Sequence, residues 1–150
     1  SRQLIAKKLY EGLGNLDGLI LPEIRKNCTH VYYMFFMKLD LNLLKGAKRE
    51  NIFNALKAEG VEGLSLKYLN IHLLPIFQRK QAYGTKGFPW NSEFTKRDIN
   101  YNKGICPVSE SLEDKNYLGF QMCLFEMDEI EVDLMISSFQ KVWKNLEHLN

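Results

Sequence analysis

The sequence contains the run Val31-Tyr32-Tyr33-Met34-Phe35-Phe36-Met37-Lys38-Leu39. Aromatic and large apolar side chains occupy both odd and even positions of this run, whereas a half-exposed strand alternates apolar with polar side chains. The pattern predicts a β-strand that is buried on both faces. A strand with two buried faces belongs in the middle of a sheet, so we expect residues 31–39 to form a central strand.

The segments that follow this run predict a helix and a second strand. Residues 49–59 have the apolar spacing of an amphipathic helix, and Gly60 stands where a residue in the left-handed conformation commonly ends one. The apolar face of this helix carries Ile52, Phe53 and Leu56. A short strand is predicted near residues 63–68.

The last third of the chain predicts a short helix over residues 109–117, a strand over residues 118–124 and a long helix over residues 128–146. Asp128, with Glu131 three residues later, forms a capping-box pattern at the start of the long helix. Apolar side chains then recur at the spacing of one helical face, at Val132, Met135, Ile136, Phe139, Val142, Trp143 and Leu146.

Helices and strands therefore alternate along the chain. The alternation begins with an amphipathic helix, because apolar side chains near the N-terminus also fall at helical spacing, at Leu4, Ile5, Leu9, Leu13 and Leu16. The order of elements predicts an α/β (α+β) fold that forms a single domain over residues 1–150. In this fold a small, mostly antiparallel sheet is covered by helices.

Residues 78–107 predict a long loop. Glycine, proline and asparagine are too dense there for a long regular element, at Gly84, Gly87, Pro89, Asn91, Asn100, Asn102, Gly104 and Pro107. Loops of this length are usually functional or mobile.

Composition limits the classes of partner. The chain has 150 residues, and its 20 Lys and Arg against 18 Asp and Glu give a net charge of only +2, which disfavours a nucleic-acid partner. No apolar run approaches the roughly 18 residues of a membrane span, and no signal-peptide pattern is present. Because the chain starts without Met, directly at a predicted helix, we expect it to be a piece of a longer protein.

The three cysteines predict neither a disulfide framework nor a zinc site. Cys28, Cys106 and Cys123 are odd in number and widely spaced, without a CxxC pair. They indicate reduced thiols in a cytoplasmic protein.

Residues 66–77 hold the most informative polar side chains. Tyr68 and His72 stand four residues apart among apolar neighbours, shortly before Pro75. A histidine in such a place is more often structural than functional, and Tyr68 could equally be an ordinary aromatic at a strand end.

Five segments resemble, in order, the C-terminal domain of the DegT/DnrJ/StrS aminotransferases. They are residues 31–36, residues 56–61, the motif Tyr68-x-x-x-His72-x-x-Pro75-x-Phe77, the motif Cys106-Pro107-Val108-Ser109-Glu110, and residues 128–143. In that family the corresponding pieces are a strand beginning His-Val, a helix ending Leu-x-x-x-Gly-Ile, His-Tyr-x-x-x-His-x-x-Pro-x-Tyr, Phe-Pro-x-Ala-Glu and a terminal helix. No single piece is specific, but five in the right order are.

The resemblance implies the small C-terminal domain of a fold-type I enzyme that depends on pyridoxal phosphate. Such enzymes transfer an amino group, usually from glutamate or glutamine, to a keto group of a nucleotide-linked sugar or a cyclitol, often in polysaccharide biosynthesis. They are expected to be homodimers. The family's cofactor lies in a large N-terminal domain that this chain lacks, so we assign it no catalytic or cofactor-binding residue and expect it to be inactive alone.

By the same resemblance, Tyr68 and His72 are candidates for substrate binding, together with Lys67. Lys67 takes the place of the histidine in the family's His-Tyr pair, and a lysine is a flexible point charge that could meet a phosphate, whereas an imidazole could transfer a proton or stack. A second departure is Leu118-Gly119-Phe120, where the family commonly has Leu-Pro.

A non-enzymatic binding module is the alternative. Within residues 78–103, cationic side chains are interleaved with aromatic ones, which suits a nucleotide, a single-stranded nucleic acid or a protein partner. The cations are Arg79, Lys80, Lys86, Lys96, Arg97 and Lys103, and the aromatic residues are Tyr83, Phe88, Trp90, Phe94 and Tyr101. A solvated loop with a few aromatic side chains packed onto the protein is the simpler explanation.

Overall fold

The computed structural model describes residues 2–93 and 95–150. The chain forms two compact units: the first combines the residues before Tyr68 with Lys115–Asn150, and the second is Tyr68–Asp114. The predicted role of Phe94 lies outside the described residues.

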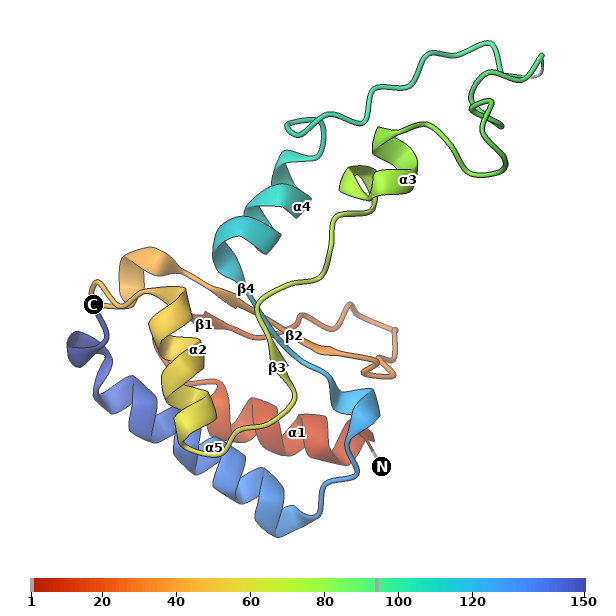
Figure 1. Cartoon of the computed structure of the whole chain (residues 1–150). Helices are drawn as coiled ribbons and strands as arrows, with labels where there is room; N and C mark the ends of the chain where they lie inside the picture. Colours follow the sequence, from red (N-terminus) through yellow and green to blue (C-terminus); the bar gives the residue numbers. More distant parts are fainter. Residues whose placement is uncertain (1, 94) are drawn as a thin grey trace. The chain divides into compact units, whose positions relative to one another are not determined.

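The first unit is built on a four-stranded sheet with the order β1-β2-β4-β3 (Figure 1). Its strands are β1 (Leu19–Ile20), β2 (Phe35–Leu39), β3 (Leu64–Ser65) and β4 (Tyr117–Phe120). Every neighbouring pair is antiparallel. The predicted class, a small antiparallel sheet with helices, is confirmed.

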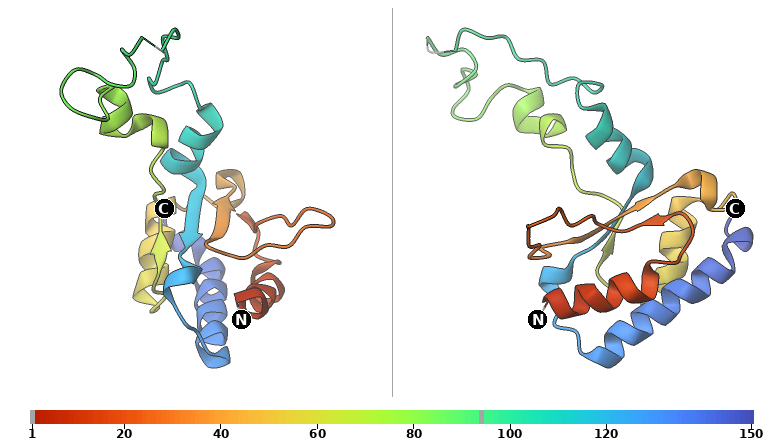
Figure 2. Two further views of the ribbon diagram at one scale, coloured as in Figure 1. Left: turned by 90° about the vertical axis from the view of Figure 1, so that its right-hand side faces the viewer. Right: turned by 180° about the vertical axis from the view of Figure 1, so that it is seen from behind.

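Three longer helices cover the sheet: α1 (Arg2–Leu13), α2 (Arg49–Ala58) and α5 (Glu129–Lys144). Figure 2 shows α1 lying beside α5. Side chains from these helices bury the inward face of β2 and β4 in one apolar core that contains Leu9, Ile52, Phe35, Leu118 and Phe139. Burial of this apolar surface is the main force that holds the unit together.

The predicted helix ends are confirmed at two places. After the C-terminal end of α2, Gly60 has φ +88°, and the N–H of Val61 donates to the Leu56 carbonyl at 3.0 Å. At the start of α5, the N–H of Glu131 donates to Asp128 Oδ1 at 2.9 Å, and the N–H of Asp128 donates to Glu131 Oε2 at 2.8 Å. Both orphan amides are thus satisfied, as a capping box requires.

The prediction that residues 31–39 form a strand buried on both faces is wrong, although β2 does lie inside the sheet. Tyr32 has φ +50°, which breaks the extended backbone, and β2 begins only at Phe35. Its side chains alternate between buried and exposed, so Phe36 is 37% exposed while Met37 is fully buried.

β4 is instead the strand that is buried on both faces. The Tyr117 side chain, 2% exposed, folds along its own strand over Gly119. A methyl group at Gly119 would overlap the Tyr117 hydroxyl and Cζ and lie 2.9 Å from Cε2. The departure at Leu118-Gly119-Phe120 therefore has a structural reason, since a bare backbone makes room for this ring.

Two predicted elements of the last third of the chain differ from the structure in their bounds. The predicted helix over residues 109–117 is α4 (Pro107–Ser111) followed by a π-helical turn at Leu112–Asn116. The predicted strand over residues 118–124 ends at Phe120, and Met122–Leu124 form a 3-10 turn.

The second unit begins with a 3-10 turn, η2 (Ile71–Leu73), and the short helix α3 (Pro75–Gln78). Between α3 and α4 the described residues contain no helix and no strand, as the loop prediction requires. A single antiparallel bridge joins Tyr83 to Phe88. Across residues 2–93 and 95–150, we find no helix with the length and apolar character needed to span a membrane.

Candidate functional site

The three predicted site residues lie in different surroundings. Lys67 is exposed and is the last residue of the first unit before the chain enters the second. Ser65 Oγ accepts a hydrogen bond from the Lys67 N–H at 3.2 Å and donates one to the Lys67 carbonyl at 2.8 Å. Tyr68, the first residue of the second unit, is 58% exposed. Its hydroxyl makes no hydrogen bond to any residue that the structure describes, so it is open to a ligand.

His72 is held by a carboxylate that the sequence analysis did not single out. It lies in η2, where its side chain is only 11% exposed, and its Nε2 is 2.9 Å from Glu110 Oε1. Glu110 lies 38 residues further along the chain, in α4. The pair joins the beginning of the second unit to its end.

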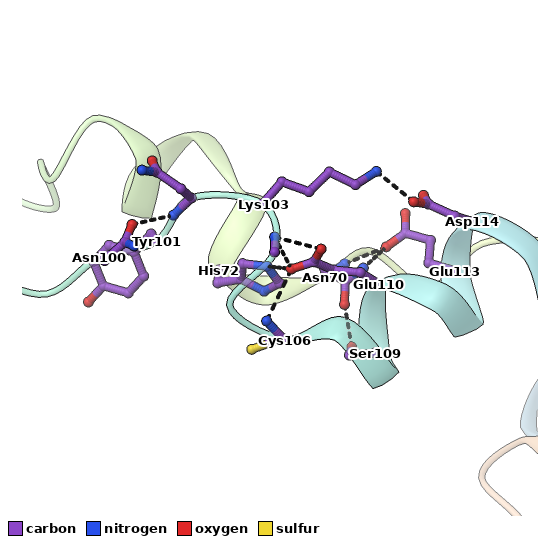
Figure 3. A network of polar contacts seen from close by, with 12 residues as sticks. Asn70, His72, Asn100, Tyr101, Lys103, Cys106, Ser109, Glu110, Glu113 and Asp114 are labelled. Carbon is purple, nitrogen blue, oxygen red and sulfur yellow. Dashed lines mark hydrogen bonds and ion pairs between the residues drawn. The ribbon is translucent and has the colours of Figure 1, made fainter.

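Glu110 also accepts hydrogen bonds from the backbone that precedes α4 (Figure 3). The N–H of Gly104 donates to its two carboxylate oxygens at 2.9 and 2.7 Å, and the N–H of Cys106 donates at 3.2 Å. Burial alone would raise the pKa of this carboxyl, but the hydrogen bonds from Cys106, Gly104 and His72 outweigh it and hold the pKa below its ordinary range. The carboxylate is therefore ionised at neutral pH.

Because Glu110 is ionised, the nitrogen of His72 that carries the proton can be assigned. An ionised carboxylate can only accept hydrogen bonds, so His72 must carry a proton on Nε2 and donate it. That nitrogen cannot then act as a base. Among the described residues none hydrogen-bonds to Nδ1 of His72, which leaves this second nitrogen for a ligand.

Further polar contacts tie the same three segments together (Figure 3). The N–H and Nδ2 of Asn70 donate to Glu113 Oε2 at 2.8 and 2.6 Å, and Ser109 Oγ donates to the Asn70 side-chain carbonyl. Lys103 Nζ lies 2.6 Å from Asp114 Oδ2, and this hydrogen bond raises the pKa of Lys103. We name the interacting set of Asn70, His72, Ser109, Glu110 and Glu113 the polar clasp.

The loop between α3 and α4 divides its aromatic residues into two groups. Phe77, Trp90 and Tyr101 pack together, with ring centroids 5.3–6.3 Å apart, and Trp90 Nε1 donates to the Tyr101 hydroxyl at 3.0 Å. Tyr83 and Phe88 form a separate pair with centroids 6.1 Å apart, and they are 72% and 48% exposed. The first group is a half-buried cluster within the loop, whereas the second is exposed to solvent.

The cations of this loop divide in the same way. Lys80 lies 2.7 Å from Asp98, and Lys103 lies 2.6 Å from Asp114. The remaining cations of the loop, Arg79, Lys86, Lys96 and Arg97, form no ion pair with the part of the chain that the structure describes.

Sequence reasoning missed the polar clasp, because its members are separated by the whole loop. The signal was present in Cys106-Pro107-Val108-Ser109-Glu110, whose Glu belongs to the motif that carried the resemblance. The motif gave no indication of its partner.

The described residues do not fit pyridoxal phosphate. A Schiff base needs an uncharged amine in a protected site, yet no lysine among the described residues is buried, and the two half-buried ones, Lys8 and Lys80, are paired with carboxylates. The part of the chain that the structure describes also brings together no group of three or more His, Cys, Asp or Glu that could hold a metal ion.

Comparison with solved structures identifies the fold. The chain superimposes on the aminotransferase TlmJ from Streptoalloteichus hindustanus with a TM-score of 0.62 and 18% identity, over 97% of this chain and 31% of that one. The fold is that of a small domain of an aminotransferase. No family model matches the chain.

Two curated proteins are similar in sequence. MJ1066, an uncharacterized protein of Methanocaldococcus jannaschii, is 31% identical over 100 residues, which are 66% of this chain and 25% of that protein. The spore coat polysaccharide biosynthesis protein SpsC of Bacillus subtilis is 25% identical over 113 residues, which are 75% of this chain and 28% of SpsC. The chain thus spans about a quarter of the length of these relatives.

Proposed function

We propose that this chain is the C-terminal part of a pyridoxal-phosphate-dependent aminotransferase of the DegT/DnrJ/StrS family. The enzyme would aminate a keto group of a nucleotide-linked sugar or a cyclitol, with glutamate or glutamine as amino donor. The observation that carries the proposal is the aminotransferase fold over 97% of the chain. The similarity to a polysaccharide biosynthesis protein supports the sugar substrate.

In this proposal the chain supplies part of the wall of the substrate cleft, and the cofactor is held by a longer polypeptide that contains it. Tyr68 offers an exposed hydroxyl to the substrate, and Lys67 an exposed charge that suits a phosphate. His72 offers Nδ1 while Glu110 fixes its ring. A homodimeric, cytoplasmic parent enzyme is part of the same proposal.

The test is an amino-transfer assay with the longer polypeptide, glutamate or glutamine, and a nucleotide-linked keto sugar. We expect transfer by the parent and none by the 150-residue chain alone, which should also give no internal-aldimine absorbance with added cofactor. Tyr68→Phe should raise KM while the fold is kept, and Tyr33→Phe, at another exposed tyrosine, is the matched control. Absence of transfer from either donor to nucleotide-linked keto sugars and keto cyclitols would refute the proposal.

A non-enzymatic binding module remains the second candidate function. The exposed Tyr83 and Phe88 rings are the observation that favours it. Tight, salt-sensitive binding of an oligonucleotide, together with no amino transfer, would decide for this candidate.

A further inference from the structure

The bridge between Tyr83 and Phe88 closes a small hairpin, residues 82–88, within the loop between α3 and α4. The N–H groups of Ala82 and Tyr83 donate to the Phe88 carbonyl at 3.0 and 3.4 Å. Gly84 and Gly87, with φ +62° and +78°, supply the left-handed positions of the turn. The turn thus holds the two aromatic side chains side by side.

The turn of the hairpin is also anchored by Asn91. Asn91 Nδ2 donates to the Lys86 carbonyl, and the N–H of Asn91 donates to the Gly87 carbonyl at 3.2 Å. The backbone at Lys86 is therefore fixed by the residues that follow it, although its side chain is exposed. An anchored turn presents its side chains to a ligand with less loss of conformational entropy than a free loop.

Among the described residues, the two exposed rings contact each other and make no ring contact with the half-buried cluster of Phe77, Trp90 and Tyr101. The two rings are tilted by 52° to one another, so a planar ligand can stack on the face of one ring and meet the edge of the other. Tyr83, the more exposed of the two, offers the face, and stacking of this kind tolerates any base.

The charge around the rings selects the ligand further. Lys86 lies in the turn between them and Arg79 three residues before the hairpin, and neither is neutralised by a described carboxylate. From residue 79 to residue 90 the sequence contains no Asp or Glu. An anionic group attached to a planar ring is the ligand that matches both features.

We propose that the hairpin of residues 82–88 is a nucleotide-binding element, in which Tyr83 stacks on the base of a nucleoside diphosphate, Phe88 holds the Tyr83 ring in place and meets the edge of the base, and Lys86 meets the phosphates. The choice of a nucleoside diphosphate over a nucleic acid rests on the proposed function, since a nucleotide-linked sugar carries this group. The near-neutral net charge of the chain also disfavours a polyanion.

The experiment is an amide NMR titration of the 150-residue chain with uridine 5′-diphosphate, with uridine and inorganic diphosphate as partial ligands. We expect saturable shifts at residues 82–88 with the diphosphate and weaker binding of either partial ligand. Tyr83→Ala should weaken binding by about 5- to 150-fold, the range for loss of one base stack, and Phe88→Ala should weaken it by a smaller factor. Lys86→Ala should weaken the nucleotide but leave uridine unchanged.

Matched controls exist in the first unit. Tyr33→Ala removes another exposed ring, 58% exposed, and Lys26→Ala another exposed lysine, so both should bind as the unaltered chain does. Unchanged binding in Tyr83→Ala and Phe88→Ala, or no binding of the nucleotide at millimolar concentration, would overturn the inference. So would an oligothymidylate that binds with a steep salt dependence while the mononucleotide does not.

The failure of this inference can be separated from failure of the proposed function. If the longer polypeptide aminates a nucleotide-linked keto sugar with an unchanged KM in the Tyr83→Ala variant, the hairpin inference is wrong and the function stands. If the hairpin binds the nucleotide but no amino transfer is found, the function is wrong and the binding site stands.

Discussion

Replacing Gly119 with alanine should destabilise the first unit through a single side chain, Tyr117. The added methyl group would overlap the phenol, so the ring must leave its place over the strand. Backbone strain is not the cause, because Gly119 has no positive φ. A tyrosine buries roughly 200 Å², and losing half of that area at about 25 cal/mol per Å² amounts to about 2.5 kcal/mol. This value lies within the range of about 1–3 kcal/mol for overpacking a core.

The cause can be isolated with a double-mutant cycle, measured by urea unfolding followed by circular dichroism. In a Tyr117→Ala background the methyl group meets no ring, and Gly119→Ala should then be neutral or stabilising by up to about 1 kcal/mol, as for alanine over glycine in a strand. The expected coupling energy is about 2.5–3.5 kcal/mol. An equal loss of stability from Gly119→Ala in both backgrounds would refute the explanation.

Three further changes test other parts of the structure. Glu110→Gln should lower hydrogen-exchange protection of the Gly104 amide at pH 7. Because the folded-state pKa of Glu110 is lowered, its contribution to stability is fully present above the pKa of an unfolded glutamate and is lost as the pH falls through the lowered folded-state pKa. If the Gly104 amide shift in the unaltered chain shows no titration in that acidic range, the hydrogen bond is misassigned. Asp128→Ala should reduce the free energy of unfolding by about 0.5–2 kcal/mol, whereas Asp128→Asn, which keeps a capping oxygen, should cost less; equal losses in calorimetry would contradict the capping role. Tyr101→Phe should reduce the free energy of unfolding by about 0.5–1.5 kcal/mol, because it removes the acceptor of the Trp90 Nε1–H. If the hydrogen exchange of this indole N–H, followed by NMR, is the same in both proteins, the bond is not formed.

Elements with local signals could be predicted from the sequence. The cap of α5 and the periodicity of its buried side chains both lie within the helix itself, so residues 128–146 were placed almost correctly. β2 was misjudged at its start because nothing in the sequence marks Tyr32 as left-handed. The burial of β4 depends on how Tyr117 lies over Gly119, which a pattern of apolar residues does not encode.

The candidate site was predictable only in part. The sequence analysis named His72 as a candidate, but the contact of His72 with Glu110 spans 38 residues and depends on how the loop returns. Distant pairs of this kind carry no periodic signal in one sequence. The sequence also does not show which aromatic residues of the loop pack together. Trp90 hydrogen-bonds to Tyr101, whereas Tyr83 stays exposed.

The second unit is an insertion in the first, and an insertion at this place can be exchanged. It is inserted between β3 and β4, which are hydrogen-bonded neighbours with Leu64 opposite Phe120 and Ser65 opposite Gly119. The strand ladder therefore holds the two ends of the insertion together, and the entropy of closing it grows only slowly with its length. Relatives could lengthen, shorten or exchange this segment, and so change what the protein recognises, without altering the register of the sheet. A shortened variant that joins the two strands by a tight turn would retain the first unit as a scaffold for grafted segments.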